Sequence, residues 1–173
     1  SDPATWSEEM RQEHLAYMKD TIKSSWEFVD YVFEIEGVTR AFTHQLVRTR
    51  TGSYAQESQR TIDASNNGYL DTVAGVAFSS YSSMLATGAA AQDARGILPT
   101  ATLTSIVAKF NLRTLHEMAK VRLCTRTQGE YQDVFRAMRA AVIAEHPWVE
   151  AYGFIEVACV AAGTCAFPRF GCA

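Results

Sequence analysis

R-T-R-T-G-S-Y-A-Q-E-S-Q-R-T, residues 48–61, places three arginines and two serines in one short run directly after an amphipathic segment. Planar guanidinium groups bind phosphate oxygens through paired hydrogen bonds, and Gly52 lets the backbone approach an anion closely enough to add N–H donors. Spacing alone leaves open a second interpretation, a solvated polar loop. The run therefore indicates either an anion-binding segment or an exposed loop.

With its lead-in G-V-T-R-A-F-T-H-Q-L-V-R, residues 37–48, this run resembles the signature of the flavin-dependent thymidylate synthases, R-H-R-x-x-S-x-N-E-x-S-x-R-Y. The positions that match the signature are Arg48, Arg50, Ser53, Ser58 and Arg60. The positions that depart from it are Thr49, Ala55, Gln56 and Thr61.

Two further segments carry the same resemblance. Residues 110–131, F-N-L-R-T-L-H-E-M-A-K-V-R-L-C-T-R-T-Q-G-E-Y, are similar to the family's N-x-R near a helix start, a later arginine, and then A-Q-x-E-I. The matching residues there are Asn111, Arg113, Arg122, Gln128 and Glu130. D-A-R-G-I-L-P, residues 93–99, looks like the family's A-R-x-x-L-P and aligns Arg95 with its arginine. Each segment alone is weak evidence for the family. Because the segments also occur in the order in which the family has them, together they are much stronger evidence for the resemblance.

The resemblance implies one flavin-dependent thymidylate synthase-like domain over residues 1–173, with FAD as cofactor, methylenetetrahydrofolate as one-carbon donor and NADPH as reductant. It also implies a homotetramer with active sites at subunit interfaces. The residues implied to bind the flavin are Arg48, Thr49, Arg50, Gln56, Asn111 and Arg113. Those implied to bind the nucleotide are Gln45, Ser58, Arg60, Thr61, Arg95 and Arg122.

Arg122 is the predicted catalytic residue. A cysteine that attacks the pyrimidine ring must be held beside basic groups as a nucleophile, and the sequence predicts no such role for Cys124, Cys159, Cys165 or Cys172. In the flavin-dependent family, reduced flavin donates hydride instead, and the protein orients the reactants and polarises the ring. By resemblance Arg122 stabilises negative charge on the uracil. Two plainer interpretations remain open: Arg122 as a surface partner of a nearby helix residue, and Asn111 with Arg113 as a helix cap beside a solvated charge.

The departures from the signature bear on the substrate. Thr61 stands where the family has an aromatic residue beside the sugar, and a smaller hydroxyl side chain leaves room for a ribose 2′-OH. The small residue predicts C5-methylation of UMP, with dUMP as a further substrate. In this respect the chain resembles the branch of the family that serves peptidyl-nucleoside antibiotic pathways. The alternatives are an ordinary dUMP-dependent thymidylate synthase and, because of Thr49 and Gln56, a catalytically inactive flavin- or nucleotide-binding homologue.

Composition excludes other classes of protein. The 173 residues carry a formal net charge of −3, which argues against nucleic acid or a membrane surface as the main partner. An RNA-binding helix built on Lys120, Arg122 and Arg126 is disfavoured for the same reason. The cysteines lack C-x-x-C spacing and the four histidines lack metal-ligand spacing, so no metal site is predicted. With no apolar run of membrane-spanning length, the sequence predicts a cytoplasmic protein.

Hydrophobic periodicity predicts a mixed α/β fold, in which a small β-sheet is flanked by long helices. Period-two alternation at Val29, Tyr31, Phe33 and Ile35 predicts a strand over residues 26–35 that ends at Gly37. A second strand is expected over 101–110, and extended chain over 53–59. The expected helices cover residues 6–20, 38–47, 69–87, 91–98, 111–122 and 128–145.

Overall fold

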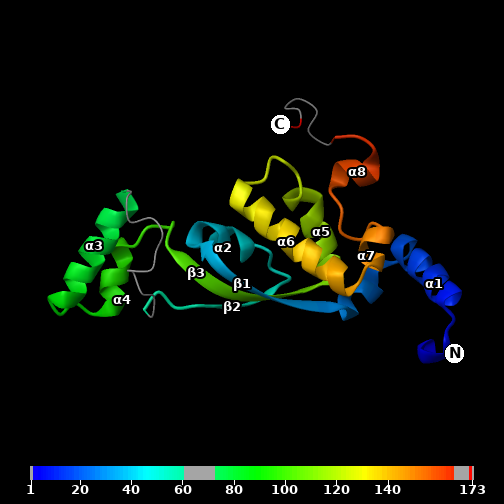
Figure 1. The fold of residues 1–173 in the computed structure, drawn as a ribbon, viewed down its shortest axis with the longest axis horizontal. Coiled ribbons are helices and arrows are strands. Elements are labelled where there is room, and N and C mark those ends of the chain that lie inside the picture. Colours follow the sequence, from blue (N-terminus) through cyan, green and yellow to red (C-terminus); the bar gives the residue numbers. More distant parts are fainter. Residues whose placement is uncertain (1, 61–72, 166–171, 173) are drawn as a thin grey trace. The chain divides into compact units, whose positions relative to one another are not determined.

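The chain forms a three-stranded sheet with strand order β1-β3-β2 (Figure 1). The computed structural model describes residues 2–60, 73–165 and 172. The strands are β1 (Asp30–Thr39), β2 (Ser53–Gln56) and β3 (Leu103–Asn111). Asp30 at the start of β1 pairs with Lys109 near the end of β3, and the Arg40 backbone N–H donates to Thr102 O, just before β3. β1 and β3 are therefore antiparallel.

The first strand confirms the predicted alternation but not the predicted bounds. Along β1, Tyr31, Phe33 and Ile35 are less exposed than the residues between them. The expected start at Trp26 is wrong, because Trp26 lies in the 3₁₀-helix η2 (Lys23–Phe28). Its indole is fully buried and donates to Met18 O at 3.0 Å, a contact that strand geometry does not supply. Gly37 takes φ +66° without ending the strand, which continues to Thr39.

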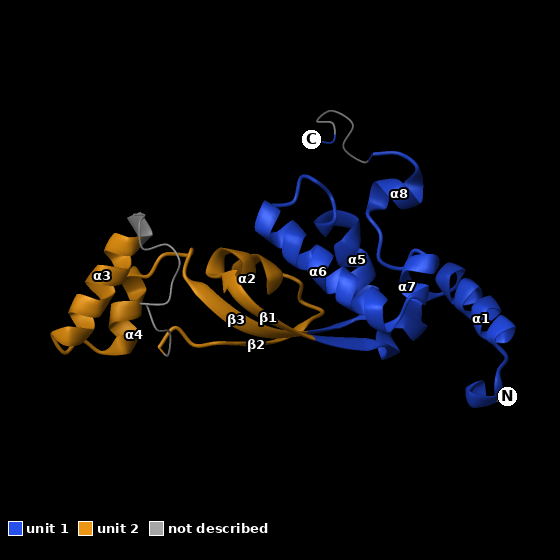
Figure 2. Cartoon of the chain, in the orientation of Figure 1, with its two compact units in different colours: residues 1–32, 109–173 blue, residues 33–108 orange. Residues whose placement is uncertain are grey.

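The described residues divide into two compact units (Figure 2). Unit 1 consists of residues 1–32 and 109–173, and unit 2 of residues 33–108. Strands β1 and β3 contribute residues to both units. The nucleotide-binding and flavin-binding residues implied by the sequence are distributed over both units, so each unit is described separately.

Unit 2 contains the helices α2 (Arg40–Leu46), α3 (Val73–Ala86) and α4 (Ala91–Ala94), followed by the 3₁₀-helix η4 (Arg95–Ile97). Thr39 caps α2, since its hydroxyl accepts from Phe42 N at 3.1 Å. A separate apolar cluster packs α3 on α4, with Phe78, Tyr81 and Ala94 buried. That packing holds η4, and with it Arg95, beside the end of α4.

Unit 1 is largely helical. Its elements are η1 (Pro3–Thr5), α1 (Glu8–Asp20), η2, α5 (Leu112–Arg122), α6 (Gly129–Glu145), α7 (Trp148–Ala151) and α8 (Ala158–Ala162). Trp26 anchors the core, 4.6 Å from the Phe154 ring between centroids. α6 ends two residues before Pro147, as expected from a residue that cannot continue a helix. Over the described residues, no helix is both long and apolar enough to cross a membrane.

The structure confirms the predicted fold class, a mixed α/β arrangement with a small sheet and long helices. The expected helices over 111–122 and 128–145 correspond to α5 and α6 within one residue at each end. The expected helix over 38–47 is shorter, because β1 extends through Val38 and Thr39. The expected helix over 69–87 corresponds to α3, and its first four residues lie outside the described chain.

Candidate functional site

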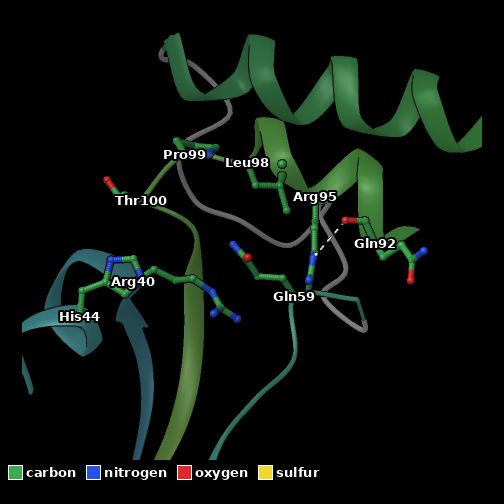
Figure 3. Close-up of a pocket in the computed structure, with 9 residues that line it drawn as sticks. Arg40, His44, Gln59, Gln92, Arg95, Leu98, Pro99 and Thr100 are labelled. Atoms are coloured by element: carbon green, nitrogen blue, oxygen red, sulfur yellow. Dashed lines mark hydrogen bonds between the residues drawn. The ribbon is translucent and has the colours of Figure 1, made fainter. Parts of the chain in front are cut away.

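Unit 2 contains a cavity of about 530 Å³ whose lining carries two arginines (Figure 3). Arg40 and His44 reach it from α2, Gln59 from the segment after β2, and Arg95 from η4. The residues that complete the lining are Gln92, Gly96, Leu98, Pro99 and Thr100. A cavity of this size with convergent polar groups suits a small ligand.

Arg40 is the half-buried cation of this cavity. One of its terminal nitrogens donates to Glu57 O at 2.8 Å, while Nε is buried without a hydrogen-bond partner among the described residues. Burial lowers the pKa of Arg40, Glu57 raises it, and Arg95 lowers it further. A buried donor without an acceptor is costly, so the geometry favours an acceptor that arrives with a ligand.

Arg95 is the second cation, and it is the one that the sequence predicted. Its Nε donates to Gln92 O at 3.2 Å, the contact drawn as a dashed line in Figure 3. The positive charge of Arg95 disfavours the charged form of Arg40 and so lowers the Arg40 pKa. Two cations that face one cavity repel each other until an anion binds between them. The pair is therefore suited to bind a phosphate or carboxylate.

The arginine run adjoins this cavity without lining it throughout. Arg48 and Arg50 are exposed in the turn after α2, and neither forms an ion pair with the described residues. The Thr49 carbonyl accepts from Tyr54 Oη at 2.6 Å, which holds this turn against β2. The two guanidinium groups thus remain available to a ligand on the surface of unit 2.

Two glutamines of the predicted site make contacts within unit 2. Gln56 Nε2 donates to Thr43 Oγ1 at 2.8 Å and so links β2 to α2. Gln45 Nε2 donates to Ala41 O within its own helix at 3.5 Å, and Gln45 is absent from the cavity lining. Its neighbour His44 lines the cavity instead and is exposed.

The end of the run forms a turn beside the cavity. Ser58 Oγ accepts from Arg60 N at 3.2 Å, and both residues are exposed. This turn presents Gln59, between them, to the cavity. Thr61, on which the sugar prediction rests, lies outside the described residues.

In unit 1, Asn111 and Arg113 stand at the start of α5. The Asn111 side-chain oxygen accepts from Thr114 N at 2.8 Å and so caps the helix. Arg113 forms an ion pair with Glu27, in which both side chains are about half exposed. These contacts match the plainer interpretation of N-x-R as a cap beside a surface charge, and they leave flavin binding by these residues as a prediction.

Arg122 is the last residue of α5. Its guanidinium lies over the Tyr131 ring, with Cζ 4.3 Å from the ring centroid. The aromatic contact comes from the next helix, α6, and differs from the surface partner on the same helix that the sequence left open. The catalytic role of Arg122 stays a prediction.

Sequence reasoning missed Arg40, His44, Gln59 and Gln92 as lining residues. One available signal was the i, i+4 spacing of Arg40 and His44, which places two polar side chains on the same face of a short helix. Among the residues that the structure describes, no three or more His, Cys, Asp or Glu side chains form a cluster that could hold a metal ion.

The fold and the cavity together define an α/β protein whose cavity is lined by two arginines and is suited to a small anionic molecule. The sequence model of the family Thy1, described as thymidylate synthase complementing protein, matches residues 3–148. The match covers most of the chain, and the chain belongs to this family.

Curated relatives agree with this assignment. The chain is 33% identical over 132 residues to the flavin-dependent thymidylate synthase of Sulfurisphaera tokodaii, a match that covers 68% of this chain and 51% of the relative. It is 36% identical over 135 residues to the enzyme of the same name from Nitratidesulfovibrio vulgaris, covering 65% of this chain and 55% of the relative. The chain thus spans about half the length of the curated relatives it matches.

A solved structure shows the same fold. The UMP/dUMP methylase PolB from Streptomyces cacaoi, bound with 5-Br dUMP, superposes with a TM-score of 0.71 at 20% sequence identity. The superposition covers 88% of this chain and 84% of PolB. This agreement confirms the expected thymidylate synthase-like fold.

Proposed function

We propose that this protein is an FAD-dependent pyrimidine-nucleotide C5-methyltransferase, acting on UMP and also on dUMP. The one-carbon donor is methylenetetrahydrofolate, the reductant is NADPH, and the reaction serves nucleoside-antibiotic biosynthesis. The observation that carries the proposal is the cavity in which Arg40 and Arg95 converge, with a buried Arg40 Nε that lacks an acceptor. Membership of the Thy1 family supports the reaction class.

The nucleotide phosphate occupies the cavity between Arg40 and Arg95. A phosphate monoester offers acceptors to the Arg40 Nε and relieves the repulsion between the two guanidinium groups. Gln59, and Ser58 and Arg60 beside it, add donors from the turn after β2. The pyrimidine is positioned with Gln45 and Thr61, and Arg122 stabilises the negative charge that develops on the ring.

The exposed arginines of the run fit a flavin dinucleotide. Arg48 and Arg50 are free of ion pairs with the described residues, and the diphosphate of FAD needs cations of this kind. The N–H groups at the start of α5, an eleven-residue helix, suit a phosphate group, and Asn111 and Arg113 at that end are proposed to bind the flavin. Thr49 and Gln56 lie along the same run. When bound, reduced FAD supplies hydride to the pyrimidine.

We further propose one domain over residues 1–173 that assembles into a homotetramer with active sites at subunit interfaces. The exposure of Arg48 and Arg50 supports this assembly, because a second subunit can complete a flavin site to which they contribute. Analytical ultracentrifugation with and without FAD tests it, and a sedimentation coefficient of a monomer in both samples would contradict it.

An ordinary thymidylate synthase that makes dTMP from dUMP is the second candidate. The observation in its favour is that the curated relatives, at 33% and 36% identity, are named flavin-dependent thymidylate synthases, whereas PolB shares 20%. The two candidates differ in whether the enzyme accepts a ribose 2′-OH.

The deciding experiment is product analysis by mass spectrometry. The purified protein is incubated with FAD, NADPH and methylenetetrahydrofolate, and with UMP or dUMP in separate reactions. Formation of 5-methyl-UMP supports the first candidate, and formation of dTMP alone supports the second. A yellow protein that binds nucleotide but forms neither product is the catalytically inactive homologue.

A further inference from the structure

The contact between Arg122 and Tyr131 joins two helices at the residue proposed to act on the pyrimidine. α5 and α6 follow one another in the chain, and Figure 2 shows both in unit 1. Arg122 Cζ lies 4.3 Å from the centre of the Tyr131 ring, within the range of a cation–π interaction. Tyr131 is fully buried, whereas Arg122 retains partial exposure. A rigid ring therefore supports a side chain that can still reach a ligand.

The backbone around this contact is held by bonds that do not involve the ring. Gln132 Nε2 donates to Leu123 O at 3.1 Å, which ties α6 to the end of α5. Thr127 Oγ1 donates to Val121 O at 2.8 Å and closes the connection between the helices. Because neither bond involves the Tyr131 side chain, we expect both to persist in variants at position 131, so that the effect of the ring on Arg122 can be measured separately.

The residue at position 131 distinguishes this chain from the family pattern. The pattern A-Q-x-E-I aligns with T-Q-G-E-Y, residues 127–131, so Tyr131 stands where the pattern has isoleucine. Both side chains fill an apolar space, but only the aromatic ring attracts a guanidinium through its face. An arginine without such a partner has several rotamers open to it and loses more entropy when it is fixed.

We infer that Tyr131 is a positioning residue, whose ring holds the Arg122 guanidinium in the orientation that the methylation reaction requires. The inference rests on the proposed function, in which Arg122 stabilises charge on the pyrimidine. It concerns a residue to which the family resemblance assigns no role. Tyr131 acts through Arg122 and need not touch the substrate.

Three variants test the inference. Tyr131→Phe keeps the ring face, Tyr131→Leu removes it, and Phe135→Leu is the matched control. Phe135 is buried one turn further along α6, so its replacement removes a similar aromatic volume from the core away from the Arg122 contact. If Tyr131→Leu does not fold, Tyr131→Met removes the ring with a more adaptable side chain.

Steady-state kinetics with UMP at saturating FAD gives the first readout. We expect Tyr131→Leu to lower kcat about fivefold or more with little change in KM, since the ring acts on a transition-state contact. Tyr131→Phe should stay within about twofold of the parent, as should Phe135→Leu. Equal losses in Tyr131→Phe and Tyr131→Leu, or an equal loss in Phe135→Leu, would overturn the inference.

Arginine Nε–Hε resonances give a second readout that needs no turnover. The Arg122 signal, assigned through its loss in Arg122→Ala, should move on Tyr131→Leu and stay near its parent position in Tyr131→Phe. An unmoved signal in Tyr131→Leu would show that the ring does not hold the guanidinium and would overturn the inference. A ring-dependent signal in a protein that methylates neither nucleotide would overturn the proposed function and the catalytic purpose of the contact, while confirming the contact itself.

Discussion

The arginines of the two units differ in what balances their charge. In unit 2, Arg40 and Arg95 face one cavity, repel each other, and leave the buried Arg40 Nε without an acceptor. In unit 1, Arg113 pairs with Glu27 and Arg122 lies over Tyr131. Among the described residues, Arg40 and Arg95 therefore lack a partner that balances their repulsion, whereas Arg113 and Arg122 each have a partner within the chain. Loss of a cavity arginine should mainly weaken ligand binding, and loss of Arg122 should mainly slow the chemical step.

Arg122→Ala is expected to have the largest effect. Removal of a cation that stabilises charge only in the transition state costs about 3–4 kcal/mol, which lowers kcat on the order of 10²- to 10³-fold. Flavin occupancy, read from the visible absorbance of the flavin, should change little in the same protein. An unchanged kcat with both UMP and dUMP would assign Arg122 a purely structural role in the contact between α5 and α6.

Arg40→Gln should have the next largest effect, on affinity. A charge-assisted hydrogen bond to a phosphate contributes about 1.5–3 kcal/mol, so the Kd for UMP should rise about 10- to 100-fold. Isothermal titration calorimetry measures this directly, with Arg48→Gln as the control that should bind UMP like the parent. If both variants lose the same affinity, UMP is not bound specifically by the cavity that contains Arg40.

Thr61→Tyr sharpens the comparison through the sugar contact that the sequence predicts for Thr61. A tyrosine would fill the volume assigned to the 2′-OH and remove a small hydroxyl partner, a change of about 1–3 kcal/mol. The ratio of kcat/KM for UMP to that for dUMP should therefore fall roughly tenfold or more. A parallel decrease for both substrates would mean that Thr61 supports the chain locally and does not contact the sugar.

Arg113→Ala separates the ion pair from flavin binding in unit 1. Surface ion pairs contribute at most about 1 kcal/mol, so the free energy of unfolding should change little. Flavin occupancy should nevertheless fall several-fold if Arg113 contacts FAD. Glu27→Gln breaks the same ion pair while keeping the guanidinium, and it should purify as yellow as the parent. Equal occupancy in Arg113→Ala and the parent would remove Arg113 from the flavin site.

We expect the smallest effect from replacing His116, and this effect is on the stability of the fold. Its Nε2 lies 2.8 Å from Lys23 Nζ and its Nδ1 lies 2.7 Å from Phe154 O, so the neutral ring accepts from the lysine and donates to the carbonyl. Burial is the main cause that lowers the pKa of His116. Lys23 and Lys120 lower it further, while the Phe154 carbonyl and Glu117 raise it.

Because the pKa of His116 is lower in the folded state, the unfolded state binds the proton more readily. The stability from the neutral ring is complete above the unfolded value of about 6.5 and is lost as the pH falls below it. Denaturant titrations at about pH 8 and pH 5 measure how far the free energy of unfolding decreases between the two pH values. This decrease should be smaller for His116→Gln than for the parent. Equal decreases in both proteins would mean that His116 does not contribute to the loss of stability at low pH.

Local chemistry explains how much of the fold the sequence predicted. The alternation in β1, the Asn111 cap of α5 and the break before Pro147 depend on neighbours within a few residues, and all are present in the structure. Trp26 shows the limit of such reasoning. Its place among β-prone residues predicted a strand, but a bond to Met18 and a contact with Phe154 place it in a 3₁₀-helix.

The sequence by itself determined the family and the fold class, because motifs at fixed spacings in a fixed order are a local property of the chain. Only the tertiary structure brought Arg40 to the same cavity as Arg95 and placed the Arg122 guanidinium over the Tyr131 ring. The physical reason is range. Helix and strand periodicity act over a few residues, whereas the pairing of charges and rings depends on which segments pack together and on what that packing removes from water.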